Sequence, residues 1–172
     1  MLNGILLTLL AAGAALQPLF VLGRSTNANV VVYSAELGPD GGIDPRKPLE
    51  AHWVMKAQDG RIEALNEIER KLAYGFSAKP AGPGQWVVTL NAFRDRPLTL
   101  MHLSDGWHLV TSVGGAPSVL QRAFVTATDE LDVPEVKSCE LWGKSVIDGS
   151  PTREILRPRK KRARRWDGDG SW

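Results

Sequence analysis

The stretch Asn27-Ala28-Asn29-Val30-Val31-Val32-Tyr33 opens the part of the chain that decides its fold. A polar start runs into β-branched and aromatic residues, which favour strands. The run is continuous rather than alternating, which predicts a strand over residues 29–35 that is buried on both faces. Turn-forming residues separate it from a second strand predicted at residues 49–57. Asp59-Gly60 then signals a hairpin and a short returning strand at residues 61–65.

One short helix is predicted next. Asn66 and Glu69 have the spacing of a capping box, in which the Asn side chain accepts from a backbone N–H and the Glu side chain reaches back. This spacing predicts a helix that begins at Asn66 and ends by Ala73. The apolar spacing also fits a longer helix over residues 61–72, which is the competing interpretation.

The rest of the body is a series of short strands with Gly and Pro between them. Strands are predicted over residues 85–93, 98–103, 107–113, 117–128 and 133–146. Because nearly every link is as short as a hairpin turn, the predicted fold is mainly β, an antiparallel meander that closes into a small barrel, with one short helix. A β-sandwich is the alternative.

The N-terminus has the features of a targeting segment. Residues 5–16 are apolar and uncharged, which is typical of the core of a signal peptide. Ala12 and Ala14 offer a cleavage site, and Val21-Leu22-Gly23 offers a later one. Because apolar residues continue to Leu22, a membrane anchor over residues 5–22 is the alternative, and a buried core helix is the third interpretation. The chain is therefore expected to be periplasmic or secreted, or else membrane-anchored.

The charge is unevenly distributed. The chain has 21 Lys and Arg against 19 Asp and Glu, yet eight of the basic and only three of the acidic residues follow Ser150. The predicted organisation is a leader over residues 1–23, a β-rich domain over residues 27–148 and a disordered basic tail over residues 149–172. Six basic residues of the tail are candidate contacts for an anionic envelope surface: Arg159, Lys160, Lys161, Arg162, Arg164 and Arg165. Nucleic acid is the less favoured partner, and solvated charge without a partner is the third possibility.

Metal, cofactor and nucleophile chemistry have little support in the sequence. The one cysteine, Cys139, excludes an internal disulfide and a Cys-rich metal cluster, and a buried apolar role suits it best. His102 and His108 flank a predicted hairpin turn at Ser104-Asp105-Gly106. A three-residue turn would place the two histidines opposite each other on one face, and a two-residue turn would place them on opposite faces. No metal or cofactor is predicted.

The aromatic residues are the best candidates for binding. Trp53, Trp86, Trp107 and Trp142 fall in four different predicted strands. They could line an apolar cavity, form an external platform for sugars, or fill the core. The candidate ligand-binding residues, chosen on this basis, are Tyr33, Trp53, Tyr74, Trp86, His102, Trp107 and His108.

Several short motifs carry a family resemblance: Asn27-x-Asn29-x-x-x-Tyr33, then Gly42 and Pro45, then Trp53, then Leu72-Ala73-Tyr74-Gly75. With these motifs the chain resembles DUF4833, a domain of unknown function of bacterial exported proteins, over residues 27–146. The resemblance implies export and a bacterial source. It implies no activity and no catalytic residues.

Three hypotheses about function follow. The first is a non-enzymatic binding module of the cell envelope, with an apolar or glycan ligand. The second is an envelope enzyme of unrecognised type, for which Tyr33, Tyr74, His102 and His108 are candidate acids and bases. The third is a structural or adaptor module that contacts anionic surfaces through the basic tail.

Overall fold

The structure is a computed structural model that describes residues 15–128 and 135–158. It contains two antiparallel meanders. The first consists of β1 (Ala15–Arg24), β2 (Asn27–Leu37), β3 (Leu49–Val54) and β4 (Ile62–Ala64). The second consists of β5 (Phe76–Gly82), β6 (Gln85–Leu90), β7 (Leu98–Leu103), β8 (Gly106–Val113), β9 (Ala116–Thr128), β10 (Glu135–Ser145) and β11 (Pro151–Leu156). The mainly β prediction is confirmed.

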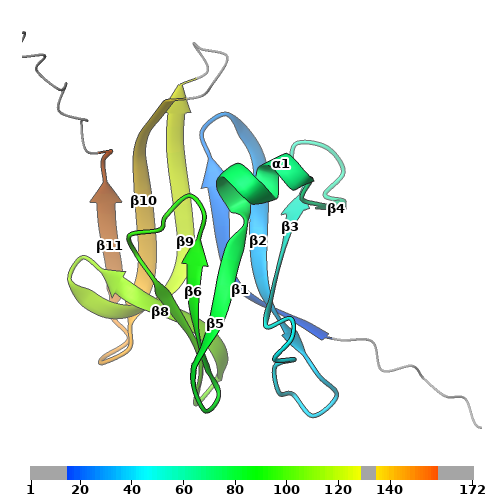
Figure 1. Ribbon diagram of the computed structural model, residues 1–172. Helices are drawn as coiled ribbons and strands as arrows, with labels where there is room; N and C mark the ends of the chain where they lie inside the picture. Colours follow the sequence, from blue (N-terminus) through cyan, green and yellow to red (C-terminus); the bar gives the residue numbers. More distant parts are fainter. Residues whose placement is uncertain (1–14, 129–134, 159–172) are drawn as a thin grey trace, which may run out of the picture.

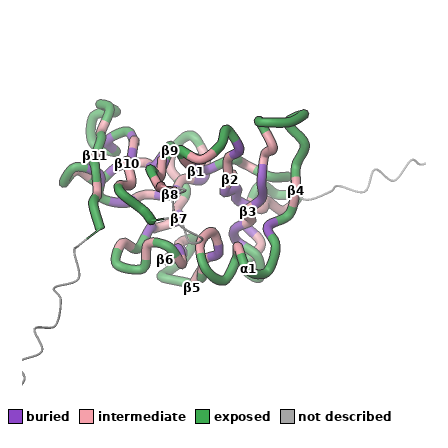
Figure 2. The backbone as a smooth tube through the Cα atoms, turned by 90° about the horizontal axis from the view of Figure 1, so that it is seen from above, coloured by how far each residue is buried: buried purple, intermediate pink, exposed green. Residues whose placement is uncertain are grey.

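The two meanders join through a parallel pair. β1 lies alongside β9, with Val21 opposite Arg122 and Leu22 opposite Ala123. On the same edge of β9 that pairs with β1, residues 116–119 pair with β8. The opposite edge of β9 pairs with β10. The strands therefore curl into a half-barrel, with β1, β2 and β3 on one side and β5 and β6 on the other (Figures 1 and 2). The sheet is therefore not one sequential meander, because β1 pairs with β9, a strand that is distant in sequence.

β1 lies within the stretch predicted to be the leader, residues 1–23, so the sheet begins before the predicted domain boundary. Residues 15–24 form β1, which is hydrogen-bonded on both sides, to β2 and to β9. Phe20 and Leu22 are buried in the core. The apolar part of β1, which lies between two neighbouring strands, has the same composition as a signal-peptide core, which is why the sequence alone predicts it to be part of the leader. Residues 1–14 lie outside the described part, and no helix in that part is long and apolar enough to span a membrane.

The predicted tail also begins too early. Pro151–Leu156 form β11, which pairs with β10 from Lys144 opposite Pro151 to Cys139 opposite Leu156. Its residues alternate between exposed and half-buried, so the strand has only one covered face. The six basic residues predicted to contact anionic surfaces lie outside the described residues.

The helix is where the sequence predicts it. α1 (Glu67–Glu69) begins after Asn66, whose side chain accepts from the Glu69 backbone N–H, while the Glu69 carboxylate accepts from the Asn66 backbone N–H. The helix continues as a wider π-helical turn, η1 (Arg70–Tyr74). The returning strand predicted before it is β4. In Figure 1, α1 sits above one end of the half-barrel, between β3 and β5.

The β7–β8 hairpin has a register that the sequence leaves undecided. Leu103 lies opposite Gly106, so Ser104 and Asp105 form a two-residue turn. His102 then lies opposite Trp107, and His108 lies opposite Met101. The two histidines are on opposite faces of the sheet, so the two-residue turn forms and the three-residue turn that would pair them does not.

Candidate functional site: an apolar cavity in the half-barrel

A cavity of about 470 Å³ lies inside the half-barrel. Side chains that alternate along the strands point into it, so every second residue of a strand reaches the interior. Its wall is mainly apolar and includes Phe20, Leu22, Leu90, Leu98, Leu120 and Ala123. The volume is in the range of small-molecule sites, which are also mostly apolar with a few polar groups.

The turn η1 forms one wall of this cavity through Leu72, Ala73 and Tyr74. Asn91 fixes this wall, because its side-chain amide donates to the Arg70 carbonyl at 2.7 Å and its backbone N–H donates to the Gly75 carbonyl at 2.8 Å. A Cβ at Gly75 would lie only 1.9 Å from the Arg70 carbonyl oxygen. The path of the backbone at the end of η1 therefore requires glycine at this position.

Tyr33 is the largest fully buried side chain of the wall. Its ring stacks on Phe20 with centroids 4.4 Å apart, and its hydroxyl donates to the Tyr74 carbonyl at 2.8 Å. Burial raises the pKa of Tyr33 far above that of an exposed tyrosine, and the nearby Tyr74 adds to this. The phenol is therefore neutral at physiological pH and joins β2 to η1.

Arg24 brings a positive charge to the cavity wall. It is the last residue of β1, and its guanidinium lies over the ring of Trp53, with Cζ 4.9 Å from the ring centroid. Nη1 donates to the Tyr74 hydroxyl at 3.2 Å. Trp53 in turn meets the Tyr74 ring edge to face at 5.0 Å. These three residues form one aromatic and cationic cluster, which we call the Arg24 cluster.

A second arginine reaches the wall but is neutralised. Arg96 contacts both carboxylate oxygens of Glu154 on β11, at 2.7 and 2.8 Å. Cys139 lies nearby on β10, and burial raises the pKa of its thiol to about 11. A thiol with this pKa is almost entirely protonated at neutral pH, so it contributes apolar surface to the wall.

The predicted ligand-binding residues fall into separate groups. Tyr33 and Tyr74 line the cavity, and Trp53 packs behind Tyr74. Trp86 and Trp107 pack against each other with ring centroids 5.7 Å apart, and both are buried in the core. The four predicted tryptophans therefore do not converge on one site.

The two histidines lie apart from the cavity lining. His102 packs edge to face on Trp107 at 5.2 Å. His108 lies 2.8 Å from the Asp105 carboxylate, on the other face of the hairpin. No contact in the described part of the chain joins either histidine to Tyr33 or Tyr74, so the four candidate acids and bases do not form one catalytic group.

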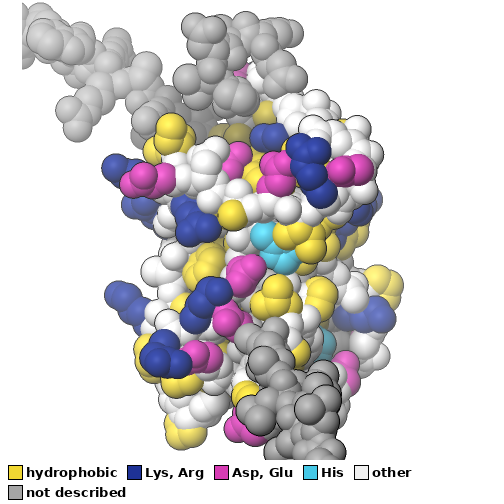
Figure 3. Space-filling view, turned by 90° about the vertical axis from the view of Figure 1, so that its right-hand side faces the viewer, with side chains coloured by type: hydrophobic (Ala, Val, Ile, Leu, Met, Phe, Trp, Pro, Cys, Tyr) yellow, Lys and Arg dark blue, Asp and Glu magenta, His cyan; other side chains and the backbone are white. Residues whose placement is uncertain are grey.

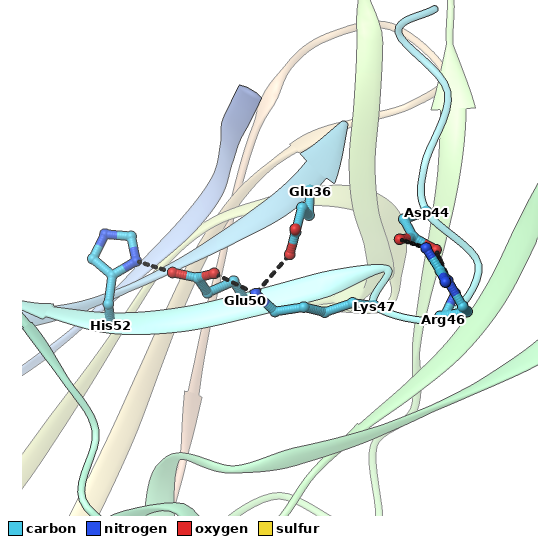
Figure 4. A network of polar contacts seen from close by, with 6 residues as sticks. All are labelled: Glu36, Asp44, Arg46, Lys47, Glu50 and His52. Carbon is cyan, nitrogen blue, oxygen red and sulfur yellow. Dashed lines mark hydrogen bonds and ion pairs between the residues drawn. The ribbon is translucent and has the colours of Figure 1, made fainter. Parts of the chain in front are cut away.

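A second hollow, also of about 470 Å³, lies between β3 and η1 and is lined by both charged and apolar side chains. Figure 4 shows its network, in which the Lys47 ammonium lies 2.7 Å from Glu36 and 2.8 Å from Glu50. The Glu36 carboxylate, followed by that of Glu50, raises the pKa of Lys47. His52 Nδ1 is 3.7 Å from Glu50, which is too far for a hydrogen bond. Because the Lys47 ammonium bridges a carboxylate of β2 and one of β3, this network stabilises the β2–β3 connection.

The described residues hold no cluster of metal ligands. Within residues 15–128 and 135–158, no three His, Cys, Asp or Glu side chains come together to bind a metal ion. The face over β3, β4 and α1 mixes acidic, basic and hydrophobic side chains (Figure 3). The inner cavity is thus the best-defined candidate site.

Sequence reasoning missed most of the cavity lining. Arg24 stands in a polar segment between two strands, and nothing local indicates that its side chain turns inward. Arg96 stands in a loop, and its partner Glu154 lies in the stretch predicted to be disordered. Only the aromatic character of Tyr33 and Tyr74 gave a usable signal.

The fold and the cavity define a β half-barrel domain. The chain belongs to the family described as a domain of unknown function, DUF4833, whose model matches residues 20–155. The match begins within β1 and ends within β11, so it includes strands at both ends that the sequence analysis had assigned to leader and tail. No curated protein and no solved structure matches the chain significantly.

Proposed function

We propose that this protein is a non-enzymatic binding module that holds a small apolar molecule inside the half-barrel. The observation that carries the proposal is the cavity of about 470 Å³ walled by Leu22, Leu90, Leu120 and Ala123. Well-packed interiors contain few voids larger than a water molecule, so an apolar space of this size favours a ligand. The tyrosine hydroxyls and arginines supply the few polar groups that fix orientation in such sites.

An apolar ligand fits this cavity better than a glycan does. Sugars need many hydrogen-bond partners and flat, accessible aromatic faces. Trp86 and Trp107 pack on each other in the core, and Trp53 is covered by Arg24 and Tyr74. Trp142, on the outer face, lies 5.0 Å from the Arg122 guanidinium.

Export remains part of the proposal. β1 (Ala15–Arg24) follows the candidate cleavage site at Ala12 and Ala14 and contains the later one at Val21-Leu22-Gly23. Cleavage there would leave β1 complete, whereas cleavage after Gly23 would remove it. We therefore propose processing after Ala14, delivery to the bacterial envelope, and contact of residues 159–165 with anionic surfaces. Mass spectrometry of the mature protein tests the cleavage position; an intact Met1, or a first residue after Ala15, would contradict it.

Displacement of a neutral fluorescent probe, N-phenyl-1-naphthylamine, by 1-decanol tests the binding function. The expected result is saturable displacement by the wild type and weakening by about tenfold in A123L, which fills the cavity. A81L adds the same volume at an exposed position of β5 and should bind like the wild type. Absence of probe binding, or equal binding by A123L, would contradict the proposal.

A further inference from the structure

The Arg24 cluster has a charge that the described part of the chain does not neutralise. Arg96, the other arginine of the cavity wall, is held by both oxygens of Glu154. Arg24 has no carboxylate within ion-pair distance among the described residues. Its guanidinium lies over the buried ring of Trp53. This cation–π contact is favourable, but the ring carries no net charge and does not neutralise the arginine.

Hydrogen-bond donors at this cluster are also unused. A guanidinium has five N–H donors, and Arg24 uses one of them on the Tyr74 hydroxyl. Its Nε is buried without a partner in the described residues. The Tyr74 hydroxyl accepts this bond and donates none to the described residues. Buried donors are normally satisfied, so the unpartnered Arg24 Nε indicates a missing acceptor.

We infer that the ligand is a single-chain carboxylate whose head group binds Arg24 and the Tyr74 hydroxyl while its alkyl chain lies in the cavity. The inference rests on the proposed function and names the ligand class of that site. A planar carboxylate matches the fork of a guanidinium with two parallel hydrogen bonds. It carries one negative charge, which balances the one arginine of the cavity wall that lacks a carboxylate among the described residues, whereas a phosphate monoester carries nearly two at neutral pH. Leu22, two residues before Arg24 on the same inward face of β1, continues the path into the apolar wall.

The test compares decanoate with 1-decanol, which share a ten-carbon chain and differ in head-group charge, in displacement of N-phenyl-1-naphthylamine at pH 8. The wild type is expected to bind decanoate at least tenfold more tightly than decanol, because hydrogen bonds to charged groups are the stronger ones. R24Q should weaken decanoate binding far more than decanol binding and so lose this preference. Y74F should likewise weaken decanoate binding severalfold and decanol binding less. R122Q, which changes an arginine on the outer face of β9, should behave like the wild type.

Each outcome separates this inference from the proposed function. If neither decanol nor decanoate displaces the probe, the proposed function itself fails. If both bind equally well, or R24Q binds decanoate as the wild type does, the cavity binds apolar molecules but the carboxylate assignment is wrong. Tighter binding of decyl phosphate than of decanoate would also overturn it. Should R24Q fail to fold, the wild-type comparison and Y74F decide the question.

Discussion

Arg96 and Glu154 join two parts of the chain that are distant in sequence through a pair of hydrogen bonds of 2.7 and 2.8 Å. Arg96 belongs to the loop between β6 and β7, and Glu154 belongs to β11. The Glu154 carboxylate also accepts from the Gly114 backbone N–H in the turn between β8 and β9. Glu154 therefore links β11 to the β6–β7 loop and to the β8–β9 turn. This contact makes β11 part of the domain.

The Arg96–Glu154 pair makes stability depend on pH. Hydrogen bonds from Arg96, and to a lesser extent from Gly114, hold the pKa of Glu154 below its ordinary value, although burial opposes them. A carboxylate with a lowered folded-state pKa stabilises the fold above the ordinary pKa of glutamate, about 4.3, and loses that effect as the pH falls through the lower folded-state pKa. E154Q should therefore lower the free energy of unfolding by about 1–2 kcal/mol at pH 7 and by less at pH 3, as measured by urea unfolding.

Glu135 provides the matched control for E154Q. Its ion pair with Lys137 is exposed, so E135Q should change the free energy of unfolding by less than about 0.5 kcal/mol. A difference between E154Q and the wild type that stayed constant from pH 7 to pH 3 would contradict this assignment.

Deletion of the C-terminus distinguishes a strand from a tail. Removal of residues 151–172 takes away β11 and leaves Arg96 without its carboxylate, so the free energy of unfolding should fall by about 2–4 kcal/mol. Removal of residues 159–172 leaves both in place and should change it little. Thermal unfolding of the two deletion variants makes the comparison. Equal melting temperatures would mean that β11 does not stabilise the domain.

The close approach at Gly75 gives a third prediction. In G75A the new methyl group meets the Arg70 carbonyl and the Asn91 amide, so the backbone at the end of η1 must rearrange. The expected loss is more than about 2 kcal/mol, since overpacking against backbone atoms costs more than a soft side-chain contact. G41A is the control, because Gly41 has a φ of +76° but no atom within 4 Å of a built Cβ. Its cost should be only about 1 kcal/mol, the strain of the left-handed region. A loss in G75A no larger than that in G41A would contradict this account.

Cys139 reports on the cavity through its reactivity. With a pKa of about 11, on the order of 0.1% of the thiol is ionised at pH 8. Reaction with a thiol reagent at pH 8 should be about 10- to 100-fold slower than that of free cysteine, after allowing for the greater nucleophilicity of a more basic thiolate. Decanol should slow it further, because Cys139 lines the cavity. A rate like that of free cysteine would place the thiol in solvent.

Local features of the sequence predict local structure well. Asn66 and Glu69 form their capping box because both partners lie within one helical turn. The hairpin between β7 and β8 is also predicted, although its register depends on which residues face the core. Trp107 and Leu109 are buried together with Leu100, and this sets the register that the turn residues alone leave open.

Features that depend on distant contacts could not be predicted. The apolar residues around Leu22 become a strand only because β2 and β9 lie on either side, and a leader segment would have the same composition. β11 is rich in polar residues, so its sequence does not indicate a strand of the domain. Its place in the sheet depends in part on the contact of Glu154 with the distant Arg96. The cavity is harder still, because it depends on which inward side chains fail to fill the interior.

The most direct measurement is an isotope-filtered nuclear Overhauser experiment on the protein with bound 1-decanol. If the half-barrel cavity is the binding site, the alkyl protons should give cross-peaks to the methyl groups of Leu22, Leu90 and Ala123. Cross-peaks confined to exposed methyl groups, such as those of Ile68 and Ile147, would show that decanol binds the surface and would contradict the central claim.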